Sequence, residues 1–300
     1  MAQNRIGIHA GVWGFDWSPA SAERAISSAA SLGYDLIEIP AIDPGRHSAV
    51  DTRASLRRHG LESTVSLALT TADDITSADG SIVARGERRL LDAVRFAADI
   101  GSRFVGGVVY SAMGRYSAPA SAEGRDGSLA VLRRVAVAAA ADGITLGVEY
   151  VNRYESNLLN TARQTLEFLD ELDAPNAVLH LDTFHAHVEE ADITDPVMLA
   201  GDRLGYIHAS ESHRGPLGTG SLDWPRLTRA LVAEGYRGDI TVETFSSAML
   251  TDDETADIGV WRRLWDDPDR LAAHSLDYLR RQLHEASVVP TSAPLAGSDH

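Results

Sequence analysis

Four short apolar stretches of this sequence end in residues that can bind a metal ion or transfer a proton. The stretches TLGVE, VLHLD, GYIH and ITVE end in Glu149, Asp182, His208 and Glu243, and an earlier one, DLIE, ends in Glu38. A carboxylate at the end of a buried strand must be paired, protonated or metal-bound, because burying it alone is costly. Any one of them could form a salt bridge to an arginine, and Glu38 could equally be a substrate contact at the rim. Four in succession indicate one shared site.

Three carboxylates and one imidazole form a donor set that suits a divalent cation. Converging carboxylates repel one another, and a cation makes them mutually compatible. Because most of the donors are oxygen atoms, the set favours Mn²⁺ or Mg²⁺, with Co²⁺ feasible and Zn²⁺ less suited. Such an ion could hold two neighbouring substrate oxygens and stabilise an enediolate.

The stretch LHLDTFHAHVEE (179–190) holds further ionisable side chains. His187, Glu189 and Glu190 follow the strand on the side of the next helix, so we expect them to be solvated or to cap that helix. His180 precedes the strand end by two residues and could face the barrel interior or its rim. It receives no role from the sequence.

One pattern recurs along the chain: an amphipathic helix, a glycine and a short apolar strand. Its five copies are SSAASLGYDLIEI, TRASLRRHGLESTVSLAL, VRFAADIGSRFVGGVVY, AVAAAADGITLGVEYV and RALVAEGYRGDITVETF. Glycine suits the end of a helix because it adopts the left-handed conformation without steric cost. We therefore expect helix ends at Gly33, Gly60, Gly101, Gly143 and Gly235.

Three more strands bring the total to eight. They are expected in RIGIHA near the N-terminus, in AVLHLD (177–182) and in RLGYIHA (203–209). Continuous apolar strands alternating with helices are typical of a parallel sheet covered by helices. Eight such units over about 250 residues predict a (β/α)8 TIM barrel, a single α/β domain over residues 1–285. An open doubly wound sheet is the alternative, although no G-x-G-x-x-G turn follows the first strand.

The composition excludes several kinds of function. The chain has no cysteine, and all 27 of its basic residues are arginine, which removes thiolate, Schiff-base and P-loop chemistry. A formal net charge of −16 argues against nucleic acid or an anionic membrane as a partner. No apolar run could span a bilayer and the first residues do not resemble a signal peptide, so we expect a cytoplasmic protein. The small, polar, proline-containing tail 286–300 is expected to be disordered.

Five stretches of the chain resemble a known family. GVEYVNRYESNLLNT, LDTFHAHVEE, IHASESHRG, VETF and IGVWRRL are similar to the ketose 3-epimerases (D-tagatose and D-psicose, or D-allulose, 3-epimerases) of the xylose-isomerase-like TIM-barrel superfamily. The similarity runs from the first strand to about residue 283. It implies an isomerase that epimerises a free ketose at C3 through a metal-stabilised cis-enediolate, and it implies a homodimer or homotetramer.

The resemblance also implies roles for individual residues. Glu149, Asp182, His208 and Glu243 would hold the metal, with Mn²⁺ favoured over Mg²⁺ or Co²⁺. Glu149 and Glu243 would also exchange the C3 proton on opposite faces of the sugar. The implied substrate contacts are Glu155, His185 and Arg214 around C1 to C3, and, at less well matched positions, His9, Trp17 and Ser66.

Other functions remain open from the sequence. An aldose–ketose isomerase similar to hydroxypyruvate isomerase could use the same metal site to move a proton between C1 and C2. An apurinic-site endonuclease shares the barrel but would need more histidine ligands and a basic surface, which the net charge disfavours. A sugar-binding barrel without catalysis is the third alternative.

Overall fold

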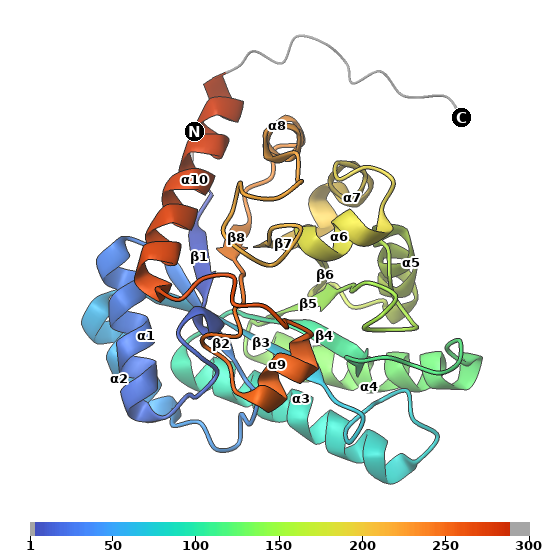
Figure 1. The fold of residues 1–300 in the computed structure, drawn as a ribbon. Coiled ribbons are helices and arrows are strands. Elements are labelled where there is room, and N and C mark those ends of the chain that lie inside the picture. The colour runs from blue at the N-terminus through green and yellow to red at the C-terminus, as the bar shows by residue number, and fades with distance from the viewer. Residues whose placement is uncertain (1–3, 289–300) are drawn as a thin grey trace.

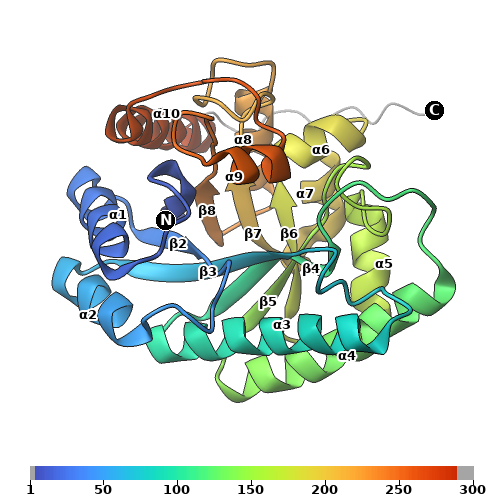
Figure 2. The same ribbon diagram turned by 60° about the horizontal axis from the view of Figure 1, so that its bottom comes forward.

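Eight parallel strands close into a barrel in the computed structural model, which describes residues 4–288 (Figures 1 and 2). The strands pair in chain order, and the last pairs with the first. They are β1 (Ile6–His9), β2 (Leu36–Pro40), β3 (Glu62–Leu69), β4 (Phe104–Ala112), β5 (Thr145–Glu149), β6 (Ala177–Asp182), β7 (Leu204–Ala209) and β8 (Asp239–Val242). The prediction of a single TIM-barrel domain is confirmed, and the open doubly wound sheet is wrong.

Most of the helices surround the barrel on its outer face, whereas α9 lies across one end of it (Figure 2). The helices are α1 (Pro19–Leu32), α2 (Ala49–His59), α3 (Gly80–Ile100), α4 (Ala122–Ala141), α5 (Ala162–Leu172), α6 (Thr183–Glu189), α7 (Asp195–Ala200), α8 (Trp224–Ala233), α9 (Asp252–Ile258) and α10 (Pro268–Val288). Among the helices of residues 4–288, none has the length and apolar character needed to cross a membrane.

The five expected glycines all lie at helix ends. Gly33, Gly60 and Gly101 cap α1, α2 and α3 in the left-handed conformation. Gly143 and Gly235 have positive φ angles of 67° and 71° and lie just beyond the ends of α4 and α8. Each glycine therefore turns the chain from a helix toward the next strand.

The last helix closes the ring between the two ends of the chain. α10 packs against α8 and α1, and the hydroxyl of Tyr34, just after α1, donates to the carbonyl of Ala272 at 2.8 Å. The helix continues to Val288, with Ala286 buried. The expected tail 286–300 therefore starts too early by three residues, and the rest of it, 289–300, lies outside the described residues.

The register of the strands collects the ionisable side chains at one end of the barrel. His9 is paired with Glu38, Glu149 with His180, and Asp182 with His208 across neighbouring strands. All of these pairs lie toward the C-terminal ends of their strands, the end that carries chemistry in TIM barrels.

Gly86 of α3 allows a close approach that a larger residue would prevent. A Cβ atom there would lie 2.1 Å from the carbonyl oxygen of Asp73 and 2.6 Å from Cγ2 of Ile75. Alanine inside a helix normally stabilises by up to about 1 kcal/mol relative to glycine. We expect Gly86→Ala to reverse that sign and lower the free energy of unfolding by about 1–3 kcal/mol, because overpacking shifts the backbone.

Gly80 of the same helix is the matched control, because a Cβ there meets nothing within 4 Å. Gly80→Ala is expected to leave the free energy of unfolding unchanged or slightly higher. Urea unfolding followed by circular dichroism measures both variants. Equal effects at the two positions would contradict the close approach.

Candidate active site

The four ionisable strand ends come together in the structure. Glu149 ends β5, Asp182 ends β6, His208 lies on β7 and Glu243 directly follows β8, and all four are buried. The ligand atoms of Asp182, His208 and Glu243 lie within 4.8 Å of one another. Nδ1 of His208 lies 3.4 Å from Oε1 of Glu149 and 3.5 Å from Oε1 of Glu243. This cluster could bind a metal ion.

The surroundings of His208 fit a cation. Its Nδ1 is buried and has no hydrogen-bond partner among residues 4–288. Burial opposes a charged imidazole, but Glu243, Glu38 and Glu149 outweigh it and raise the pKa of His208 well above its ordinary value. The carboxylates therefore favour a positive charge at this position, which a metal ion between these oxygens and the bare nitrogen would supply.

Arg214 supplies a permanent positive charge next to the cluster. Its NH1 donates to Oδ2 of Asp182 at 2.8 Å and also to Oε2 of Glu243. The guanidinium lies over the ring of Phe184, 4.3 Å from its centroid. Burial alone would lower the pKa of Arg214, but Asp182 and Glu243 hold it above its ordinary value, so the side chain stays charged.

The protein's own charges give the two glutamates different pKa values. Burial raises the pKa of Glu149 to about 7, although His208 works against the shift. Burial also opposes ionisation of Glu243, but His208 and then Arg214 outweigh it and lower its pKa to about 2. Paired carboxyl groups with separated pKa values are typical of sites that donate and accept protons.

His185 is held between the loop after β5 and Arg214. The backbone N–H of Asn152 donates to Nδ1 of His185 at 3.1 Å. Burial lowers the pKa of His185 to about 3, so the ring is neutral. NH2 of Arg214, which can only donate, lies 3.0 Å from Nε2, and Nε2 lies 3.9 Å from Oε2 of Glu155. Both nitrogens of the neutral ring therefore face N–H donors, and a ligand oxygen between Arg214 and Nε2 would relieve this conflict by accepting from both side chains.

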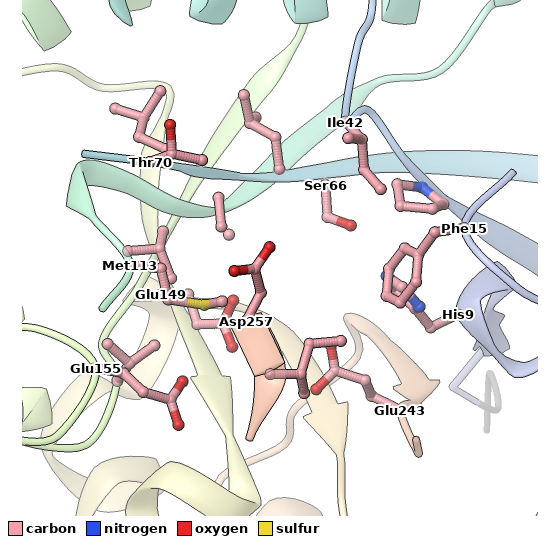
Figure 3. Close-up of a pocket in the computed structure, with 18 of the residues that line it drawn as sticks. His9, Phe15, Ile42, Ser66, Thr70, Met113, Glu149, Glu155, Glu243 and Asp257 are labelled. Atoms are coloured by element: carbon pink, nitrogen blue, oxygen red, sulfur yellow. The ribbon is translucent and has the colours of Figure 1, made fainter. Parts of the chain in front are cut away.

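The cluster forms one side of a cavity of about 360 Å³, a size suited to a small molecule (Figure 3). Its polar lining includes His9, Ser66, Glu149, Glu155, His185, His208, Arg214 and Glu243. The apolar lining includes Phe15, Ile42, Leu67, Val108, Met113 and Phe245. Glu254, Asp257 and Ile258 of α9 complete the lining. Figure 3 shows Glu149, Glu155 and Glu243 pointing into this space.

Comparison with known proteins identifies the family. The family model described as xylose isomerase-like TIM barrel matches residues 26–282. An L-ribulose 3-epimerase of Methylomonas sp. (strain DH-1) is 45% identical over 92% of this chain and 96% of its own length. A ketose 3-epimerase of Arthrobacter globiformis is 40% identical over 93% of this chain and 96% of its own length.

A solved structure agrees with these relatives. The crystal structure of a D-allulose 3-epimerase from Methylomonas sp. in complex with D-allulose superposes with a TM-score of 0.91 and 44% identity, over 94% of this chain and 98% of that one. This chain belongs to the xylose isomerase-like TIM-barrel family, among its ketose 3-epimerases. The predicted resemblance is therefore confirmed, and the chain is an enzyme of the isomerase class.

Most of the residues that the ketose 3-epimerase resemblance assigned to substrate do line the cavity, but Trp17 does not. Its side chain is buried, and its indole N–H donates to the hydroxyl of Thr52 at 3.1 Å, which ties the start of α1 to α2. The aromatic residue that reaches the cavity from this loop is Phe15, stacked on Phe245. The loop 10–18 has no periodic pattern that would show which of its rings turns inward.

Two glutamates of the LHLDTFHAHVEE stretch have partners that the sequence did not show. Glu189 accepts from the backbone N–H of Arg153 at 2.7 Å and from its guanidinium, with only 5% of its side chain exposed. Glu190 accepts from the backbone N–H of Ala162 at 2.8 Å, at the start of α5. Both side chains fix the loop between β5 and α5. The prediction of solvated residues or a helix cap is therefore wrong for Glu189, whereas Glu190 is the C-terminal cap residue of α6 and donates its backbone N–H to the carbonyl of Ala186 at 2.8 Å. His187 is exposed as expected.

The loop after β7 holds Arg214 in a strained backbone conformation. Arg214 has a φ angle of 62°, which a side chain other than glycine rarely adopts. Its carbonyl accepts from the hydroxyl of Thr244 at 2.6 Å and from the N–H of Phe245 at 3.0 Å.

A buried carboxylate in the same loop, Glu211, was not singled out from the sequence. It accepts hydrogen bonds from the backbone N–H groups of Ser212, Gly218 and Leu222 and from the indole of Trp224.

Glu211 should therefore stabilise the loop that carries Arg214 in a pH-dependent manner. Burial alone would raise its pKa, but the indole of Trp224 and the backbone amides outweigh it and lower the pKa below the ordinary 4.5. A lowered pKa means that the stabilisation is fully present above about pH 4.5 and is lost as pH falls through the folded-state value. At pH 7 we expect Glu211→Gln to lower the free energy of unfolding by about 2–3 kcal/mol.

Urea unfolding of wild type and Glu211→Gln at pH 7, 5 and 3.5 measures this difference, which should shrink at the lowest pH. Glu62→Gln is the control, because Glu62 is 68% exposed in its pair with Arg5 and surface pairs contribute about 1 kcal/mol or less. A difference that stays constant down to pH 3.5 would contradict the role of the Glu211 carboxylate.

Proposed function

We propose that this enzyme epimerises a free ketose at C3 with a divalent cation held by Glu149, Asp182, His208 and Glu243. One observation carries the proposal: two buried glutamates from β5 and from the end of β8 face one cavity, with Nδ1 of His208 within 3.5 Å of both. The names of the relatives, L-ribulose 3-epimerase and ketose 3-epimerase, support the same reaction.

The two glutamates exchange the proton at C3. One removes it from one face of the sugar, giving an enediolate, and the other returns a proton to the opposite face. Which of Glu149 and Glu243 acts first depends on the starting epimer. Each carboxylate has two oxygens, so one can ligate the cation while the other faces C3. A bound divalent cation supplies Lewis-acid stabilisation of the negative charge that develops on the substrate.

His185 and Arg214 serve the oxygen that becomes negative. Both side chains line the cavity, and NH2 of Arg214 lies 3.0 Å from Nε2 of His185. A substrate oxygen that binds between them replaces this contact. Nε2 then carries the ring proton, because Nδ1 accepts from the backbone N–H of Asn152, and both groups donate to that oxygen. Donors already fixed in place before the reaction need no reorganisation as charge develops. Glu155, held by the Nδ2 of Asn152 at 2.8 Å, accepts from a substrate hydroxyl.

The charges that line the cavity favour an unphosphorylated sugar. Among the described residues, its two lining arginines are both engaged by carboxylates: Arg214 as above, and Arg89 with Oδ2 of Asp73 at 2.6 Å. Glu254 and Asp257 add negative charge on α9. We propose a five- or six-carbon ketose, in line with relatives named for L-ribulose and D-psicose.

Deuterium incorporation distinguishes this reaction from its nearest alternative. When the enzyme turns over L-ribulose or D-fructose in D₂O with Mn²⁺, deuterium should enter C3, because the proton removed there exchanges with solvent. Mass spectrometry and NMR locate the label. Label confined to C1 or C2 would favour the aldose–ketose isomerase instead.

Glu243→Gln should abolish turnover while keeping the fold. The amide has the volume of the carboxylate but cannot take the proton, and general acid–base groups contribute about 10²–10⁴-fold in rate. Glu167→Gln on the exposed face of α5 is the matched control and should retain wild-type kcat. A wild type without ketose turnover would instead favour the sugar-binding barrel.

Removal of the metal should abolish activity reversibly. After dialysis against EDTA we expect turnover to fall to background and Mn²⁺ to restore it. The three carboxylates suit Mn²⁺ and Mg²⁺ better than Co²⁺, and the one imidazole favours Mn²⁺ over Mg²⁺. Full activity in the chelated enzyme, checked by metal analysis, would contradict the proposed cation.

Two further expectations stay predictions. The enzyme should be a homodimer or homotetramer, which light scattering checks, and it should be located in the cytoplasm.

A further inference from the structure

Glu38 of β2 lies inside the barrel beneath the proposed cation site and has no part in the reaction described above. Its side chain is 1% exposed. Nε2 of His208 lies 2.9 and 3.0 Å from its two oxygens, and the hydroxyl of Tyr206 donates to Oε2 at 2.7 Å. Nε2 of His9 lies 3.9 Å from Oε1. Glu38 therefore contacts Nε2 of His208, the ring nitrogen that faces away from the other proposed ligands. From this position it can orient the His208 ring.

The contacts of Glu38 hold it in a fixed polar layer. Tyr206 and His208 lie two residues apart on β7, so both side chains point to the barrel interior. The hydroxyl of Tyr206 also meets the hydroxyls of Thr64 at 2.8 Å and of Thr241. Strands β2, β3, β7 and β8 thus share one hydrogen-bonded network around this carboxylate, which restricts where it can move.

The hydrogen bond to Glu38 determines which nitrogen of His208 is free. A carboxylate only accepts hydrogen bonds, so the nitrogen facing it, Nε2, must carry a proton. In a neutral ring the lone pair then lies on Nδ1. That nitrogen faces Glu149 and Glu243 at 3.4 and 3.5 Å and has no other partner among the described residues.

We propose that Glu38 is a positioning residue for the cation site, which fixes the tautomer and the ring orientation of His208 so that Nδ1 is presented to the metal ion. The inference rests on the proposed function. Carboxylate–histidine–metal arrangements strengthen the ligand nitrogen, and loss of the outer carboxylate typically weakens metal affinity 10–100-fold. The ring of His180 also packs against the ring of His208, with the two centroids 4.1 Å apart, and this contact limits how far the His208 ring can tilt.

Glu38→Gln tests the proposal with metal binding as the readout. The amide keeps the size of the side chain but is a weaker acceptor, and it can turn its NH2 toward Nε2, which selects the opposite tautomer. Isothermal titration of the metal-free protein with Mn²⁺ should show affinity weakened 10–100-fold. Thr165→Val is the matched control: it removes a buried hydroxyl of α5 that donates to the carbonyl of Thr161 and has no hydrogen bond to Glu38 or its network, and it should bind Mn²⁺ within threefold of wild type.

A second readout separates positioning from general stability. Mn²⁺ raises the melting temperature of a protein that binds it only when folded. We expect this increment to be smaller in Glu38→Gln and unchanged in Thr165→Val. In activity assays the Mn²⁺ concentration for half-maximal rate should rise in Glu38→Gln, and excess Mn²⁺ should recover most of kcat. A merely structural role would lower the melting temperature of the metal-free protein and leave the increment unchanged.

The outcomes are distinct. Equal Mn²⁺ affinity in wild type and Glu38→Gln overturns the role of Glu38 while leaving the proposed function intact. A wild type that binds no divalent metal overturns the proposed function. If Glu38→Gln does not fold, Glu38→Asp carries the test, because it keeps the charge and withdraws the carboxylate by one methylene. It should bind Mn²⁺ more weakly than wild type, and unchanged affinity would overturn the proposal.

Discussion

Mutual repulsion among buried carboxylates is the constraint on which the rest of this site depends. Glu149 ends β5, Asp182 ends β6 and Glu243 directly follows β8 of a closed barrel, so the strand register holds their backbone positions close together. Burial removes the water that would screen them. Positive charge must therefore be supplied. Arg214 contributes it from one side, and a protonated His208 contributes it from the other until the proposed cation takes over that charge. The same groups separate the pKa values of Glu149 and Glu243, which is the condition for one carboxyl group to donate while the other accepts.

The positive charge of Arg214 comes with strain in the backbone of the loop that carries it. Arg214 reaches the carboxylates from a backbone position with a φ of 62°, and the loop around it is held by Glu211, whose four donors come from the residues that follow. Glu189 holds the loop after β5 in the same way through Arg153. In both loops a buried carboxylate binds backbone N–H groups and so fixes a side chain that faces the cavity. The barrel thus places the residues at the strand ends, and the hydrogen-bonded loops after β5 and β7 place the other side chains of the site.

The barrel and its cluster of ionisable strand ends could be predicted from the sequence because both follow from simple periodicity. Parallel strands bring their C-terminal ends together, so a residue type at a strand end also gives its place in space. The contacts that the sequence did not show join segments that no local pattern connects. Glu38 meets His208 across 170 positions of the chain, and Glu190 caps α5, which precedes it by 28 residues. Trp17 was predicted to line the cavity but does not, for a related reason. In an irregular loop, packing decides which way each side chain points, and the indole of Trp17 points to Thr52.

The charged side chains that line the cavity also bear on which sugars it can bind. The arginine near the cluster is engaged by carboxylates, Arg89 is engaged by Asp73, and α9 brings further acidic groups to the cavity. A phosphorylated sugar would have to break one of these pairs or lie unpaired beside Glu254 and Asp257, and either costs free energy. A free ketose brings only hydroxyl and carbonyl oxygens, which the donors on His185 and Arg214 and the acceptor on Glu155 can satisfy directly. The proposed substrate class thus agrees with the electrostatic balance that makes the four strand ends compatible.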